Sequence, residues 1–238
     1  MLESLKEEVL NANLRLVGSG LVVLTWGNAS GFDPESKCVV IKPSGVEYSR
    51  MTANDMVVLD LNGNVVEGNL RPSSDTPTHL EIYRHFSGVK GVVHTHSIEA
   101  TAWAQAMEEI PCFGTTHADT FYGSVPVTRL LTSSEVQDQY ELNIGRVIIE
   151  RFCSLEPLSV PGVLVAGHAP FTWGVSPQDA VDHAIALEAV AKMARLSRQL
   201  RSDLPPLVEY VREKHYSRKH GPNAYYGHKI GKIDFIAY

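Results

Sequence analysis

Short apolar runs recur along this chain, and turn residues end each of them. The runs read LVVLTW (21–26), CVVIK (38–42), MVVLDL (56–61), GVVHTH (91–96) and VLV (163–165). Runs of this length between turn signals are typical of buried β-strands. Asn62-Gly63, which follows MVVLDL, is the dipeptide that a tight hairpin turn requires. We therefore expect a mostly buried sheet, with GNASGFD (27–33) as the loop that leaves its first strand.

Longer segments with capping residues predict helices that cover this sheet. An apolar stripe from Leu2 to Leu16 indicates a helix that ends near Gly18. Ser176-Pro177-Gln178-Asp179 opens a helix that runs to about Leu200, because Ser176 suits the N-cap, and Pro177 and Asp179 suit the first turn. Further helices are expected to begin in PSSDTPTH, at Ser97 and near Pro206. Without repeats or a long polar linker, residues 1–238 are expected to form one domain of the α/β or α+β class.

Composition excludes several classes of function. The net charge of −6 argues against a non-specific nucleic-acid surface. The three cysteines are far apart and form no C-x-x-C pair, which suits a reducing compartment and argues against a disulfide framework. The N-terminal residues carry charges throughout, and no apolar run is long enough to span a membrane. We expect a cytoplasmic protein without nucleic-acid or membrane partners.

Two histidines at the end of GVVHTH form the first candidate site. In a strand, Val92, His94 and His96 share one face, with the two imidazoles about 7 Å apart at their Cα atoms. His168 follows the run VLV, which places a third imidazole near another strand end. Three protein ligands with one open position are typical of catalytic zinc sites. A chance grouping among ten histidines is the alternative at this point.

Two polar loops offer groups that can bind an anion. PSSDTPTH places Ser73, Ser74 and Asp75 at the start of a predicted helix, where free N–H groups and the helix dipole favour phosphate. The alternative is that Ser74 or Asp75 is a simple N-cap. KPSG supplies Lys42, Ser44 and Gly45 in a turn, although Pro-Ser-Gly is also ordinary turn chemistry.

Seven stretches together carry a family resemblance that spans nearly the whole chain. In order they are LTWGNAS, IKPSGVEYS, PSSDTPTH, GVVHTHS, GTTHADTFYG, PGVLVAGHAPFTWG and KHYSRKHGPNAYYG. This set resembles the L-ribulose-5-phosphate 4-epimerases of the metal-dependent class II aldolase and epimerase family. The resemblance implies a three-layer α/β/α domain with a central, mostly antiparallel sheet. It also implies a homotetramer with active sites at the subunit interfaces.

The resemblance implies one Zn2+ per subunit, with other divalent transition metals possible. Its ligands would be His94, His96 and His168, with Asp75 beside the metal. Ala169 stands where the family pattern has glycine, so the loop after His168 departs from that pattern. The related fuculose-phosphate aldolases carry glutamate at the position of Asp75, so aspartate favours an epimerase.

The implied reaction inverts C4 of L-ribulose 5-phosphate to give D-xylulose 5-phosphate, by cleaving and re-forming the C3–C4 bond. Asp119 and Tyr226 match the family's acid/base pair, with Tyr226 reaching in from a neighbouring subunit. The chain continues past the family pattern as residues 228–238, an extension of unknown role. The positions that match substrate- and phosphate-binding residues are Gly27, Asn28, Lys42, Ser44, Gly45, Ser73, Ser74, Thr115, Glu141, His215 and Arg218.

Three alternatives compete with the epimerase. A sugar-phosphate aldolase on the same fold would release its two fragments. A non-enzymatic scaffold, as in the head domain of adducin, would have lost the metal ligands, whereas all three histidines are present here. A zinc hydrolase or hydratase with three histidine ligands is disfavoured by the anion-binding loops. Arabinose and ascorbate degradation both use such an epimerase, and the sequence does not choose between them.

Overall fold

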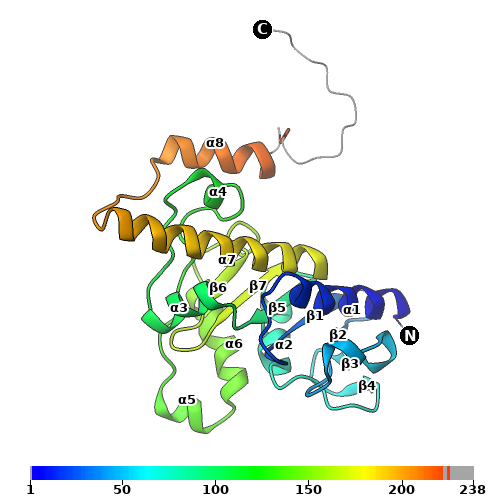
Figure 1. Cartoon of the computed structure of the whole chain (residues 1–238). Coiled ribbons are helices and arrows are strands. Elements are labelled where there is room, and N and C mark those ends of the chain that lie inside the picture. The colour runs from blue at the N-terminus through cyan, green and yellow to red at the C-terminus, as the bar shows by residue number, and fades with distance from the viewer. Residues whose placement is uncertain (1, 222–223, 226–238) are drawn as a thin grey trace.

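A seven-stranded antiparallel sheet forms the centre of the molecule (Figure 1). The computed structural model describes residues 2–221 and 224–225. The strand order is β4-β3-β2-β1-β5-β7-β6, so β5 lies in the interior of the sheet between β1 and β7. The strands are β1 (Gly27–Asp33), β2 (Cys38–Ile41), β3 (Val57–Asp60), β4 (Val65–Glu67), β5 (Gly91–Thr95), β6 (Gly162–Leu164) and β7 (Pro170–Gly174).

Helices cover both faces of the sheet, which gives the expected three-layer α/β/α arrangement. α1 and α7 pack with Val93 on one face, and α2 and α6 pack with Val92 on the other. Figure 1 shows α7 above the sheet and α2 and α6 below it. The helices are α1 (Glu3–Gly18), α2 (Thr76–His85), α3 (Ile98–Ala106), α4 (Thr115–Ala118), α5 (Ser133–Gln137), α6 (Tyr140–Arg151), α7 (Pro177–Leu200) and α8 (Glu209–His220), with 3-10 turns η1 (Tyr48–Arg50) and η2 (Ala53–Asp55).

The expectation for residues 21–33 was wrong. LVVLTW (21–26) forms a turn closed by a bridge between Val23 and Trp26, and GNASGFD (27–33) is the strand β1. Small residues are needed in β1 because it lies directly beneath two helices. A Cβ added at Gly31 would lie 2.7 Å from Leu5 Cδ1 of α1 and 3.0 Å from Pro177 Cγ of α7. Close packing therefore overrides strand propensity here.

Most other predicted elements are confirmed. Asn62-Gly63 lies in the turn between β3 and β4, with Gly63 at a φ of +88°. The Ser176 side chain caps α7 by accepting a hydrogen bond from the Asp179 N–H. The final helix begins at Glu209, slightly later than expected from Pro206. Among the described residues, no helix has the length and apolar character needed to cross a membrane.

Candidate functional site

Three histidines converge at the end of β5 beside the β6–β7 turn. His94 lies in β5, His96 follows it, and His168 lies in the turn. The Nε2 atoms of His94 and His96 are 3.1 Å apart, and one ligand atom from each of the three residues lies within 4.8 Å of the others. The turn also accommodates the fully buried Ala169, whose carbonyl accepts a hydrogen bond from the Val165 N–H.

The geometry of the triad fits a divalent metal ion. A tetrahedral zinc with bonds of about 2.0–2.1 Å separates its ligand atoms by roughly 3.3 Å, near the observed His94–His96 spacing. His94 Nδ1 donates to the Pro170 carbonyl at 2.9 Å, which fixes the tautomer and leaves Nε2 free to bind. His168 Nε2 is buried and has no hydrogen-bond partner among the described residues. The residues present can therefore hold a metal.

Burial keeps two of these imidazoles neutral, which is the form that a metal requires. Burial, together with the neighbouring His94 and His96, lowers the pKa of His168 to about 4, and the Asp75 carboxylate opposes this shift. Burial followed by the charge of His94 also lowers the pKa of His96. Because ligand histidines must be deprotonated, His96 and His168 can bind a metal at neutral pH without losing protons.

Asp75 faces the triad and does not act as a helix cap. Its side chain makes no capping hydrogen bond to α2, and instead its Oδ2 accepts from Asn28 Nδ2 at 2.6 Å. Burial raises the pKa of Asp75, but His94, His79 and the Asn28 hydrogen bond outweigh that effect and leave the pKa low. Asp75 therefore places a carboxylate beside the three imidazoles.

The two loops expected to bind phosphate lie side by side. A bridge pairs Pro43 with Pro72, the Ser44 N–H donates to the Arg71 carbonyl at 2.8 Å, and the Ser73 N–H donates to the Lys42 carbonyl at 3.1 Å. The loops share a cavity of about 420 Å³ with the histidines. Its lining is Thr25, Trp26, Gly27, Asn28, Lys42, Ser44, Gly45, Ser73, Ser74, Asp75, His94, His96, Tyr140, Glu141 and His168.

Lys42 supplies a buried positive charge to this cavity. It is 2% exposed, and its Nζ lies 3.2 Å from the Pro43 carbonyl and 4.8 Å from the centre of the Tyr48 ring. Burial lowers the pKa of Lys42, and the negative charge of Asp75 opposes that shift. A cation without its full hydration shell attracts an anion more strongly than one in bulk water.

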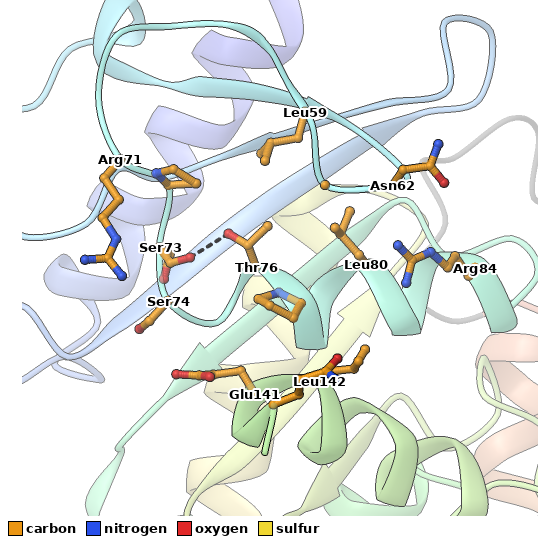
Figure 2. A pocket seen from close by; sticks show the side chains of 14 residues that line it. Leu59, Asn62, Arg71, Ser73, Ser74, Thr76, Leu80, Arg84, Glu141 and Leu142 are labelled. Carbon is orange, nitrogen blue, oxygen red and sulfur yellow. Dashed lines mark hydrogen bonds between the residues drawn. The ribbon is translucent and has the colours of Figure 1, made fainter. Parts of the chain in front are cut away.

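A second cavity, of about 550 Å³, lies on the other side of the loop that carries Ser73 and Ser74, which we call the serine loop (Figure 2). Ser73, Ser74 and Glu141 line both cavities, so this loop is a thin wall between them. The wall is held by Thr76, at the start of α2, whose Oγ1 donates to the Ser73 carbonyl at 2.6 Å. Arg84 also lines this cavity, but its Nε donates to the Leu61 carbonyl at 2.9 Å.

Asp119, at the end of α4, forms a separate charged cluster with α8. Arg218 donates to both carboxylate oxygens, at 3.1 and 2.7 Å, and His215 Nδ1 lies 3.1 Å from Oδ1. Burial raises the pKa of Asp119, but the hydrogen bonds from Arg218 and His215 outweigh it and leave the pKa low. Lys219 also contributes to this cluster, with its Nζ 3.9 Å from the same carboxylate.

The fold does not bring this second cluster to the histidine cavity. None of the described residues that line the cavity comes from α4 or α8. Figure 1 shows both helices on the far side of α7 from α2. Thr115, at the start of α4, lies with this second group. Tyr226 and the 228–238 extension lie outside the described residues.

Three cavity residues were not predicted as site residues: Thr25, Trp26 and Tyr140. Thr25 and Trp26 directly precede the predicted Gly27-Asn28 pair, and Tyr140 directly precedes the predicted Glu141. Trp26 is 52% exposed, although its position in an apolar run suggested a buried strand residue. Adjacency to predicted site residues was the only signal that the sequence offered.

Comparison with known proteins agrees with this geometry. Residues 7–195 match the model of the class II aldolase and adducin N-terminal domain. The chain belongs to this family. One member, the L-ribulose-5-phosphate 4-epimerase UlaF of Salmonella paratyphi C (strain RKS4594), is 54% identical over 228 residues, which is 96% of this chain and 100% of that protein. The UlaF protein of Salmonella typhi gives the same identity and coverage.

Solved structures of the family share the fold. An L-fuculose 1-phosphate aldolase superposes with a TM-score of 0.77 at 26% identity, covering 90% of this chain and 95% of that chain. The L-fuculose-1-phosphate aldolase from Thermus thermophilus gives a TM-score of 0.66 at 22% identity, covering 85% of this chain and 99% of that chain. The second likeness supports the fold alone.

Proposed function

We propose that this protein is an L-ribulose-5-phosphate 4-epimerase, which interconverts L-ribulose 5-phosphate and D-xylulose 5-phosphate. One observation carries the proposal. A single cavity combines His94, His96 and His168, the Asp75 carboxylate and two loops rich in hydroxyl groups. The 54% identity to the UlaF epimerases over nearly the whole chain supports the same activity.

The reaction explains why one site needs both a metal and an anion cradle. The hydrogen on C4 of the substrate is not acidic, because C4 is not adjacent to the carbonyl carbon. Inversion at C4 therefore proceeds by breaking the C3–C4 bond, turning the aldehyde fragment over and re-forming the bond on its other face. A divalent cation held by the three histidines, which we take to be Zn2+, supplies Lewis acidity toward the carbonyl and hydroxyl oxygens of the ketose.

In this proposal the paired loops hold the phosphate of the aldehyde fragment while its carbonyl turns. Ser44, Gly45, Ser73 and Ser74 offer hydroxyl and backbone groups to the phosphate oxygens, and Lys42 adds positive charge. Asn28 donates to both Ser73 Oγ and Asp75 Oδ2, at 3.1 and 2.6 Å, so it ties the phosphate end of the cavity to the metal end.

Proton transfer at the C4 oxygen is assigned to Asp119 and Tyr226. Since Asp119 lies outside the cavity of its own chain, we propose that it acts in the cavity of a neighbouring copy, within a homotetramer. His215, Arg218 and Thr115 would accompany it there. Arg218 and His215 keep Asp119 ionised, so it is suited to accept a proton or to orient one.

The test is product analysis with L-ribulose 5-phosphate and the metal-loaded protein. We expect D-xylulose 5-phosphate to form until equilibrium is reached, with no accumulation of smaller fragments. Metal-stripped protein should be inactive, and added zinc should restore turnover. Accumulation of dihydroxyacetone and glycolaldehyde phosphate without xylulose 5-phosphate would instead identify an aldolase. A protein that binds no metal and turns over no substrate would support the scaffold alternative.

A further inference from the structure

We propose that Tyr48 is a positioning residue for phosphate, because one buried side chain holds both Gly27 and Lys42 in place. This inference rests on the proposed function of the cavity. Tyr48 does not line the cavity itself. It begins the turn η1, and it is 7% exposed among the apolar side chains Val9, Val40 and Met56.

The hydroxyl group of Tyr48 fixes the first loop. It donates a hydrogen bond of 2.7 Å to the carbonyl of Gly27, the first residue of β1. Gly27 has a φ of +119°, and a Cβ added there would lie 2.9 Å from the His94 carbonyl oxygen. The backbone at this point is therefore in a conformation that only glycine adopts readily, and the buried hydrogen bond stabilises it.

The aromatic ring of Tyr48 fixes the second loop. The Nζ atom of Lys42 lies 4.8 Å from the ring centre, within the range of a cation–π interaction. Burial of Lys42 disfavours its charge, whereas the electron-rich ring face favours it. Tyr48 thus holds the buried ammonium group in place at the wall of the cavity, which Lys42 lines.

Asn28 connects the loop that Tyr48 holds at Gly27 to a third loop, which carries Ser73. Asn28 follows Gly27, and its Nδ2 donates to Ser73 Oγ of the serine loop at 3.1 Å. The orientation of the Asn28 amide is determined, because Asp75 Oδ2 at 2.6 Å can only accept from the nitrogen. The loops at Gly27, Lys42 and Ser73 are therefore positioned relative to one another around Tyr48.

Two substitutions separate the contributions of the hydroxyl and the ring. Tyr48→Phe removes the bond to Gly27 and keeps the ring beneath Lys42, while Tyr48→Leu removes both. The matched control is Tyr83→Phe, because Tyr83 is 6% exposed and its hydroxyl lies 2.7 Å from Ser30 Oγ, outside the three loops. Both phenylalanine variants lose the hydrogen bonding of a buried tyrosine hydroxyl, so a general effect of that loss on folding would be common to them.

The readouts are the Kd for inorganic phosphate by titration calorimetry, and KM and kcat for L-ribulose 5-phosphate. For Tyr48→Phe we expect Kd and KM to rise about fivefold to tenfold, with kcat changed less than about threefold. For Tyr48→Leu we expect Kd and KM to rise roughly 10–100-fold. Tyr83→Phe should leave both constants near the wild-type values, and all variants should retain their metal.

Three results would overturn the role of Tyr48. The first is an equal change in Kd and KM for Tyr48→Phe and Tyr83→Phe. The second is a loss confined to kcat, and the third is a wild-type protein with no affinity for phosphate. The proposed function fails separately, if wild-type protein binds phosphate and metal but does not epimerise L-ribulose 5-phosphate. In that case the calorimetric comparison of Tyr48→Phe with Tyr83→Phe still decides the positioning role.

Discussion

The histidine cavity and the Asp119 cluster are built in opposite ways. The cavity is assembled from strand ends and loops, with His94 2% exposed and the Asp75 carboxylate beside three imidazoles. The Asp119 cluster joins two helices, and its aspartate is surrounded by cationic or protonatable groups from α8. The cavity sets one buried carboxylate against imidazoles, whereas the Asp119 cluster sets a carboxylate against cationic side chains of one helix.

This difference determines whether each region can form its part of the site within one chain. The pairing of β5 with β1 and β7 sets His94 against Asn28 and Phe171, so the cavity is preorganised within one chain. Asp119 is instead compensated by cationic groups of its own chain, at a distance from that chain's metal ligands. The proposed site is therefore divided between copies: one would contribute metal and phosphate binding, and the other would contribute proton transfer.

The largest expected effect is loss of the metal. His96→Ala removes one of three ligands, and we expect metal content and activity to fall together, with activity reduced by about 10³-fold or more. Elemental analysis of the purified protein and the epimerase assay measure both. The matched control is His85→Ala on α2, a half-exposed histidine outside the cavity, which should retain metal and turnover. An active His96→Ala protein that lacks metal would contradict the assignment.

Asp119→Asn should separate chemistry from metal binding. Because Asp119 lies outside the cavity of its own chain, we expect unchanged metal content and a fall in kcat of about 10²–10⁴-fold. Asp203→Asn is the control, since Asp203 also pairs with an arginine, Arg201, but is exposed. Loss of metal from Asp119→Asn would mean that the two regions are not independent.

Mixing the two inactive variants tests whether the site is shared between copies. Chains carrying His96→Ala and chains carrying Asp119→Asn would be co-expressed with different tags and purified through both. In a ring assembly some sites then combine an intact cavity from one chain with an intact Asp119 from the other. We expect roughly a quarter of wild-type activity. A mixed oligomer without activity would indicate that both groups of one site come from a single chain.

The sequence predicted the cavity better than it predicted the strand beside it. His94, His96 and His168 could be proposed because imidazoles at strand ends have recognisable spacing, and the loops because hydroxyl groups and glycine cluster there. β1 was misassigned because its residues are small and polar, as in GNASG, while the preceding apolar run LVVLTW resembles a strand. The close approach of α1 and α7 at Gly31 determines which segment forms the strand, and no local sequence pattern reveals that approach.

The sequence alone also could not predict that Asp119 lies outside the cavity of its own chain. The resemblance implied a neighbouring subunit for Tyr226, and nothing in the sequence separated Asp119 from the histidines. Contacts such as Lys219 with Asp119 depend on how α8 packs against α4, which is a long-range feature. Trp26 and Tyr140 were missed because an aromatic residue beside a turn has no distinctive spacing.

The smallest expected effect concerns stability in acid and comes from a histidine in the Asp119 region. His117 in α4 is buried, and burial lowers its pKa from 6.5 to about 4, although the hydrogen bond to the Gly123 carbonyl opposes this. The unfolded chain therefore takes up a proton at a pH where the folded chain does not. Stability should fall as the pH drops below about 6.5 and level off near 4, by roughly 1–3 kcal/mol from this residue. Urea unfolding of metal-free protein at several pH values measures the slope, which should be shallower for His117→Gln than for the wild type. Equal slopes for His117→Gln and the wild type would assign the acid sensitivity to the histidines of the cavity.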